Sequence, residues 1–263
     1  MMGVLTRSLA LLLWLALPQA TSAGTTDEMI SGLFAKHGAS GAFVLLDAST
    51  GKLTVYNEER AARPMPPAST FKIANSLIAL DTGVVADENE IFPYDGKPRP
   101  LASWEKDMSL RDAIKVSNLP VYQEIARRIG LTRYHKWLAR LDYGNGKTGK
   151  NVERFWVDGP LEITAIEQVQ FLEALALRRL DATDRSQRIV RDIMRRGRRG
   201  EAVLYGKTGW TMALKPGIGW FVGWVENNGR VYSFALNIDM ASASHAKNRI
   251  DLTVDLLREL GVY

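Results

Sequence analysis

The sequence predicts an α+β fold, an α/β sandwich in which an antiparallel sheet is flanked by terminal helices and carries an inserted all-helical subdomain. Strand-like runs lie towards both ends of the chain, helical periodicity fills the middle, and a hairpin turn joins the last two strands. The 263 residues are 46% hydrophobic and 24% charged, which is enough apolar material for one domain or two closely packed subdomains.

The first 23 residues are expected to be a cleaved secretory signal peptide. Arg7 supplies a positive charge, residues 9–17 form a short apolar run, and small residues at 21–23 suit a signal peptidase. The run is shorter than the roughly 20 residues that a membrane-spanning helix needs. We therefore expect residues 24–263 to be the mature domain, in the periplasm of a Gram-negative bacterium and without a stable membrane anchor.

The N-terminal part of the mature chain predicts a helix, a hairpin and a second helix. Thr26–His37 has apolar residues on one face, and two strand-like runs, Gly41–Asp47 and Lys52–Asn57, flank a Ser-Thr-Gly turn. Four residues at 64–67, three of them prolines, interrupt regular structure. They lead into a helix predicted from Ser69 to about Asp81.

The middle of the chain, about 90–195, predicts the helical subdomain. A capping box from Thr164 to Glu167 opens an apolar run that extends to Leu180. The other segments with helical periodicity are 110–116, 121–129, 131–141 and 186–194.

The C-terminal part returns to strands. Three strands are predicted at 202–207, 219–226 and 230–239, with Asn228-Gly229 as the turn between the last two. A closing helix is predicted at about Lys247–Leu260.

Composition and charge exclude several function classes. The chain has no cysteine, and its three histidines lack metal-ligand spacing, so we expect no disulfide, cysteine nucleophile or metal site. The net charge of +5 falls to 5 − 1 = +4 without the leader. Arginines 195, 196, 198 and 199 form a basic cluster without interleaved aromatics, which we interpret as a solvated surface and not as a nucleic-acid site.

A serine and a lysine three residues apart can form a nucleophile–base pair, because they lie on one face of a helix. Only Ser69 and Lys72 follow a proline-stiffened loop and open an apolar helix, where the lysine is drawn towards the core. The local pattern leaves open that Ser69 is a plain helix cap and Lys72 a surface charge. The spacing occurs four times, at Ser49–Lys52, Ser69–Lys72, Ser103–Lys106 and Ser244–Lys247.

Burial of Lys72 would favour its neutral amine, because desolvation disfavours the charged form. A neutral amine can add CO2 to give a carbamate, whose oxygens serve as a general base and need hydrogen-bond donors. The indole N–H of Trp156 is a candidate donor. The alternative for Trp156 is simple core packing.

These residues resemble the class D serine β-lactamases, the oxacillinases. The similarity covers essentially the whole mature chain, and the motifs follow one another in that family's order. They are Pro67-Ala68-Ser69-Thr70-Phe71-Lys72, Ser117-Asn118-Leu119, Tyr143-Gly144-Asn145, Trp156, Lys207-Thr208-Gly209 and Arg249.

The resemblance implies a fold like that of serine β-lactamases and penicillin-binding proteins, and hydrolysis of β-lactam antibiotics as an antibiotic-resistance activity. It implies that Ser69 is the nucleophile and carboxylated Lys72 (N6-carboxylysine) the general base, with Trp156 holding the carbamate. Ser117 would relay a proton to the lactam nitrogen beside Lys207. No cofactor other than CO2 is implied.

Binding roles follow from the same resemblance. Lys207, Thr208 and Arg249 would bind the substrate carboxylate, and the backbone N–H groups of Ser69 and Trp210 would form the oxyanion hole. Gly209 completes the Lys-Thr-Gly strand. Leu119 stands where the family usually has valine, which leaves water access to the carbamate open. Tyr143 and Asn145 are interpreted as structural.

Three other functions stay open at this stage. The first is a non-hydrolysing β-lactam sensor, or penicillin-binding domain, which acylates but barely deacylates. The others are a cell-wall transpeptidase and a silent binding module. The preferred β-lactams and the oligomeric state do not follow from the sequence.

Overall fold

A computed structural model describes residues 22–241 and 243–263 of the chain. The leader predicted at 1–23 lies almost wholly outside the described residues. The first helix, α1, spans Ser22–Lys36 and thus begins four residues before the predicted start at Thr26. Among the described residues, no helix combines the length and the apolar character that crossing a membrane requires.

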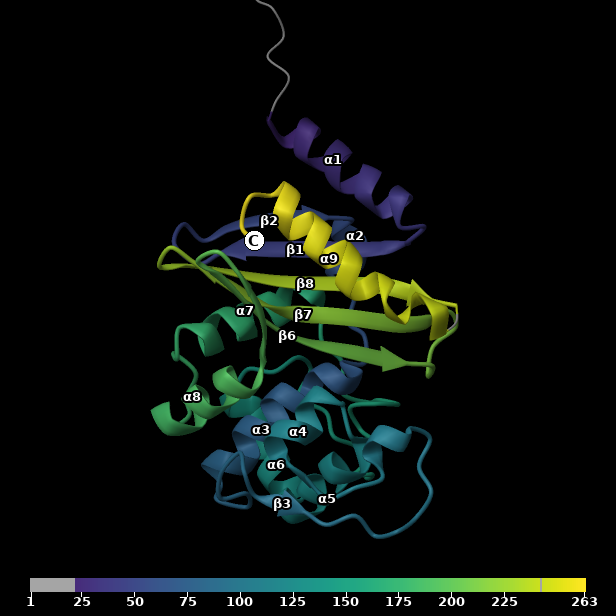
Figure 1. Cartoon of the computed structure of the whole chain (residues 1–263), viewed down its shortest axis with the longest axis vertical. Coiled ribbons are helices and arrows are strands. Elements are labelled where there is room, and N and C mark those ends of the chain that lie inside the picture. Colours follow the sequence, from purple (N-terminus) through teal and green to yellow (C-terminus); the bar gives the residue numbers. More distant parts are fainter. Residues whose placement is uncertain (1–21, 242) are drawn as a thin grey trace, which may run out of the picture.

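A six-stranded sheet, antiparallel throughout, forms the centre of the upper part of the molecule (Figure 1). Its strand order is β2-β1-β8-β7-β6-β5, so the two N-terminal strands pair with the last strand of the chain. The strands are β1 (Gly41–Asp47), β2 (Lys52–Tyr56), β5 (Arg195–Arg199), β6 (Ala202–Thr211), β7 (Gly217–Asn227) and β8 (Arg230–Met240).

Helices cover both faces of this sheet. Side chains of β8 alternate between the faces: Phe234 and Leu236 pack with α1 and α9 (Asn248–Glu259), whereas Ala235 belongs to the core on the α7 side. Helix α7 (Ala165–Ala176) lies against β8 and β1 on that second face. Because both faces are covered, the central strand β7 is buried along nearly its whole length.

The lower part of the molecule is mainly helical (Figure 1). The predicted capping box is present, since Thr164 accepts from the Glu167 N–H and Glu167 accepts from the Thr164 N–H. The short helix α2 (Glu58–Ala61) lies by β1 and β2 in the upper part (Figure 1). The remaining helices are α3 (Lys72–Asp81), α4 (Leu110–Lys115), α5 (Leu119–Ile129), α6 (Leu131–Arg140) and α8 (Asp184–Ile193).

The mixed α+β class, with an antiparallel sheet and terminal helices, is confirmed, and three details of the prediction are wrong. The insert is not all-helical, because β3 (Ile91–Phe92) pairs with β4 (Met108–Ser109). The arginine cluster forms an edge strand, β5, which the sequence pattern hides because it has no apolar residues. Ser69 lies in a 3₁₀ helix, η1 (Ala68–Phe71), and the α-helix starts only at Lys72.

Candidate active site

The turn that carries Ser69 is held in a strained conformation. Ala68 has φ of 49°, a left-handed value that costs free energy for any residue with a Cβ atom. Two hydrogen bonds from distant segments fix this turn. The Ala68 N–H donates to the Trp156 carbonyl at 2.8 Å, and the indole N–H of Trp220 donates to the Pro66 carbonyl at 3.0 Å.

Lys72 lies directly beneath the half-buried Ser69. Its Nζ donates to Ser69 Oγ at 2.9 Å and lies 5.2 Å from the centre of the Tyr122 ring. The side chain is completely buried, and burial lowers the pKa of Lys72 from 10.5 to about 7. The alternative in which Lys72 is a surface charge is therefore wrong, and near neutral pH a substantial fraction of the amine is unprotonated.

Trp156 presents a buried donor without an acceptor. The residue is fully buried and packs against Phe71 and Phe155, with ring centres 5.7 Å and 5.0 Å apart. Its Nε1 has no hydrogen-bond partner among the described residues. Since an unsatisfied buried donor costs about 1–3 kcal/mol, this N–H suits an additional hydrogen-bond acceptor.

Ser117 and Lys207 form the opposite side of the site. Lys207 Nζ donates to Ser117 Oγ at 3.0 Å and to the Thr208 carbonyl at 2.8 Å. Ser117 is a second strained residue, with φ of 58° between α4 and α5. Burial lowers the pKa of Lys207 well below its usual value, and the positive charges of Lys72, Arg196 and Arg249 lower it further.

Strand β6 lies against the nucleophile's turn at Gly209. A Cβ atom there would lie 2.9 Å from the Pro67 carbonyl oxygen and 3.0 Å from Thr70 Cγ2, so only glycine fits without displacement. On the other side of Gly209, Arg249 Nη1 donates to the Gly209 carbonyl. Burial lowers the pKa of Arg249 to about 10, which still leaves it cationic at neutral pH.

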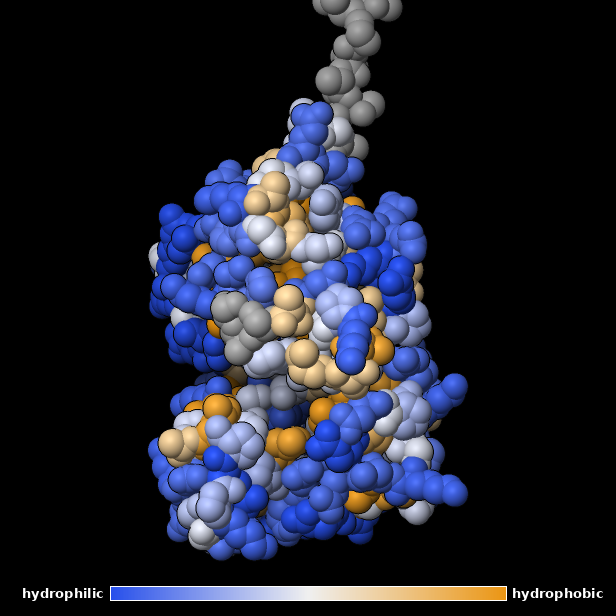
Figure 2. Space-filling model, turned by 90° about the vertical axis from the view of Figure 1, so that its right-hand side faces the viewer, coloured by the Kyte–Doolittle hydropathy of each residue, from blue (hydrophilic) through white to orange (hydrophobic). Residues whose placement is uncertain are grey.

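The remaining predicted residues lie around this centre. Thr208 is half-buried between Lys207 and Gly209, and Leu119 is half-buried at the start of α5. Trp210 is 36% exposed and neighbours the exposed Met212 and Leu214. Figure 2 shows a hollow between the sheet-bearing part above and the helical part below, with hydrophobic side chains on its rim.

Two supporting pairs were missed by the sequence analysis. Ser76 lies one turn after Lys72, and its Oγ and the Tyr122 hydroxyl share a hydrogen bond of 2.7 Å. Gln168 Nε2 donates to Thr70 Oγ1 at 2.9 Å, beside the nucleophile. The spacing of Ser76 from Lys72 was a usable signal, whereas nothing in the sequence links Gln168 to Thr70, 98 residues away.

Tyr143 and Asn145 have surroundings that fit the structural roles assigned to them. Tyr143 is buried, with its ring centre 5.5 Å from that of Phe71. Asn145 joins two loops, because its Nδ2 donates to the Pro160 carbonyl at 2.9 Å while its Oδ1 accepts from the Glu162 N–H at 3.2 Å. Tyr143 thus belongs to the core beside Phe71, and Asn145 holds two loop segments together.

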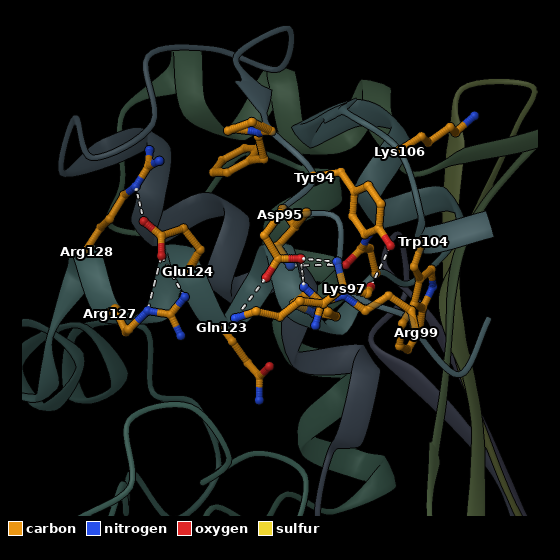
Figure 3. Close-up of a pocket in the computed structure, with 15 residues that line it drawn as sticks. Tyr94, Asp95, Lys97, Arg99, Trp104, Lys106, Gln123, Glu124, Arg127 and Arg128 are labelled. Atoms are coloured by element: carbon orange, nitrogen blue, oxygen red, sulfur yellow. Dashed lines mark hydrogen bonds and ion pairs between the residues drawn. The ribbon is translucent and has the colours of Figure 1, made fainter. Parts of the chain in front are cut away.

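A separate cavity of about 460 Å³ lies beside α5 (Figure 3). Its three arginines are paired with carboxylates. Arg99 contacts Asp95 at 2.5 Å, and Glu124 contacts Arg127 at 2.7 Å and Arg128 at 3.1 Å. We interpret these ion pairs as structural, since each arginine of the cavity is already held by a carboxylate.

Comparisons with known proteins agree with this geometry. The penicillin binding protein transpeptidase domain family matches residues 41–254, which defines the class of fold and site. β-Lactamase OXA-48 of Klebsiella pneumoniae is 43% identical over 226 residues, covering 86% of this chain and 85% of that protein. β-Lactamase OXA-5 of Pseudomonas aeruginosa is 40% identical over 232 residues, or 87% of each chain.

Solved structures give the same result. The class D β-lactamase FUS-1 (OXA-85) of Fusobacterium nucleatum subsp. polymorphum has a TM-score of 0.87 and 38% identity, covering 90% of this chain and 98% of that one. The class D β-lactamase YbXI from Nostoc also has a TM-score of 0.87, with 39% identity and coverage of 89% and 99%. The chain belongs to the class D family of serine β-lactamases, which are hydrolases.

Proposed function

We propose that this protein hydrolyses β-lactams through a covalent acyl-enzyme on Ser69, with Lys72 as the site of the general base. One observation carries the proposal. Lys72 Nζ lies 2.9 Å from Ser69 Oγ in a buried site, and its lowered pKa is due to burial alone. Such an amine is available at neutral pH both as an acceptor of the serine proton and as a nucleophile towards CO2.

The first half of the reaction opens the lactam ring. Ser69 Oγ forms a bond to the lactam carbonyl carbon as its proton passes to the base at Lys72. The carbon–nitrogen bond then breaks, and the nitrogen takes a proton from Ser117 Oγ. Ser117 regains a proton from Lys207 Nζ across 3.0 Å, because the bound substrate carboxylate favours the protonated form of Lys207. The product of this half is a Ser69 ester.

Carboxylation of Lys72 fits the residues around it. The Nε1–H of Trp156 is buried without an acceptor, and it would hold a carbamate oxygen. When present, the carbamate supplies a general base, which a protonated amine cannot. In the second half of the reaction, the base at Lys72, having lost the serine proton to solvent, would take a proton from the water molecule that attacks the Ser69 ester. It would return that proton to Ser69 Oγ as the ester bond breaks and the ring-opened acid leaves.

Substrate binding is assigned to the cationic wall of the site. Lys207 and Arg249 are both buried, and with the Thr208 hydroxyl they would hold the substrate carboxylate by charge-assisted hydrogen bonds. The close approach of β6 to η1 at Gly209 supports an oxyanion hole made by the N–H groups of Ser69 and Trp210.

The proposal includes export of the protein to the periplasm through the signal peptide at residues 1–23. The short apolar run after Arg7 supports this location. N-terminal sequencing of the protein recovered from a periplasmic extract would test it, and a chain that retains residues 1–23 in the cytoplasm would contradict it.

Mass spectrometry of the protein mixed with a penicillin tests the mechanism. We expect a transient adduct on the peptide that contains Ser69, together with many turnovers of product, and neither for Ser69→Ala. An adduct of one equivalent without turnover would instead identify a β-lactam sensor. Hydrolysis by Ser69→Ala at the normal rate would eliminate Ser69 as the nucleophile.

A further inference from the structure

The edge strand β5 carries an irregularity that changes the direction of its side chains. Its only neighbour is β6, and the pairing register shifts between Arg195, opposite Tyr205, and Gly197, opposite Leu204. Consecutive residues of a regular strand point to opposite faces, and a bulge re-aims them. This accounts for Arg195 and Arg196 lining the same surface hollows although they are adjacent in sequence.

Two hollows, of about 340 Å³ and 430 Å³, lie side by side along β5 and share Lys115, Arg195 and Arg196. We call them together the β5 trough. The first hollow reaches Lys207 of the active site, and the second adds Arg111 and Arg198. Among the described residues, Asp192 is the only carboxylate that lines either hollow, and it is paired with Arg111 at 2.7 Å.

The shared cations of the β5 trough are not neutralised. Lys115, Arg195 and Arg196 are exposed, and none of them forms an ion pair with a carboxylate among residues 22–241 and 243–263. This distinguishes the trough from the cavity of Figure 3, where arginines and acids pair with each other. Three unpaired cations in concave surfaces attract an anion of high charge.

We propose that the β5 trough is a binding site for phosphate groups. Arginine presents a planar fork of N–H donors that matches phosphate oxygens, and Arg195 and Arg196 place two such forks on one hollow beside the Lys115 ammonium. The large exposed hydrophobic side chains, such as Leu53, Ile91 and Trp210, are not among the trough's lining residues. Recognition is therefore electrostatic and suits either free phosphate or a phosphate on a lipid headgroup.

The test compares Arg195→Gln/Arg196→Gln with a control of equal charge loss, Lys52→Gln/Arg63→Gln, whose residues are exposed elsewhere on the surface. Calorimetry with inorganic phosphate measures the free ligand. Co-sedimentation with phosphatidylcholine vesicles, with and without phosphatidic acid, measures the lipid-borne group. Thermal unfolding checks that both variants are folded. These measurements do not involve β-lactam hydrolysis, so they succeed or fail independently of the proposed function.

The intact protein and the control variant should bind phosphate, in free or lipid-borne form, in a saturable way. The trough variant should bind at least about tenfold more weakly, as expected for the loss of one charge-assisted hydrogen bond. Saturable binding of inorganic phosphate identifies the free anion as the ligand, and binding to phosphatidic acid vesicles alone identifies the headgroup. Equal binding by all three proteins, no binding in either assay, or binding of a DNA oligonucleotide alone would overturn the proposal.

Discussion

The backbone N–H of Ala68 donates a 2.8 Å hydrogen bond to the carbonyl of Trp156, 88 residues further along the chain (156 − 68). This bond joins the residue before the nucleophile to the residue whose indole N–H lacks an acceptor. The nucleophile and the candidate carbamate donor are therefore fixed relative to each other by the backbone, in addition to the packing of their side chains. Any shift of the Trp156 segment would also move Ser69.

Trp156→Phe should weaken CO2 retention, because it removes the Nε1–H and keeps an aromatic ring in the core. A hydrogen bond to a charged group contributes about 1.5–3 kcal/mol, so half-maximal hydrolysis should need about ten- to a hundredfold more bicarbonate. Titrating steady-state hydrolysis with bicarbonate measures this. Trp224→Phe is the control, since Trp224 is equally buried but donates to Glu226. Identical bicarbonate curves for Trp156→Phe and the unmodified protein would refute the role of Trp156.

Lys72→Met should inactivate the enzyme and stabilise the fold at neutral pH in buffer depleted of CO2. Burial lowers the pKa of Lys72 to about 7, so the folded protein binds fewer protons than the unfolded chain between about pH 7 and 10.5. The free energy of unfolding of the unmodified protein should therefore rise with pH across that window and be lowest below pH 7. Each pKa unit corresponds to about 1.4 kcal/mol, which gives the variant an advantage of a few kcal/mol at low pH.

Urea denaturation of both proteins at several pH values tests this linkage. The difference in the free energy of unfolding between Lys72→Met and the unmodified protein should shrink as pH rises from about 7 towards 10.5. A difference that stays constant across this range would mean that the amine of Lys72 is not desolvated in the folded protein.

Gly209→Ala should lower activity far more than stability. The new Cβ would meet the Pro67 carbonyl and Thr70, which would push β6 away from the nucleophile's turn. A displacement of about 1 Å at a reacting centre costs about a hundredfold in rate, which should appear in kcat/KM for a chromogenic cephalosporin. Gly32→Ala is the control, because a Cβ at Gly32 in α1 meets no atom within 4 Å. Full activity of Gly209→Ala would show that β6 need not approach η1 this closely.

Ser117→Ala should slow the opening of the lactam ring, because Lys207 would lose the hydroxyl through which its proton reaches the lactam nitrogen. Loss of a positioned proton donor costs about a hundredfold or more. Stopped-flow measurement of the rate of acylation isolates this step. Ser76→Ala is the control, because it also deletes a buried hydroxyl near Lys72, one that bonds to Tyr122. Acylation of Ser76→Ala should be faster than acylation of Ser117→Ala. Equal rates for the two variants would argue against a relay through Ser117.

Some expectations from the sequence depended on local chemistry, and these agree with the structure. The Thr164–Glu167 capping box and the Asn228-Gly229 turn are built from neighbouring residues, so their residue types suffice to specify them. The edge strand β5 could not be predicted in this way, because Arg195–Arg199 has no apolar alternation and pairs with β6 through its backbone. The β3–β4 pair, two residues per strand, is too short for any periodic signal.

By itself the sequence determined which residue types stand at which spacing: Ser69 three residues before Lys72, an apolar helix after them, and a Lys-Thr-Gly strand with a later arginine. Tertiary structure alone decided that Lys72 is fully buried, that its pKa falls to about 7, and that the Trp156 N–H is buried without a partner among the described residues. The physical reason is that spacing along a helix is a local property of the backbone. Desolvation and hydrogen-bond satisfaction depend instead on every segment that packs around a group, and those segments come from all parts of the chain.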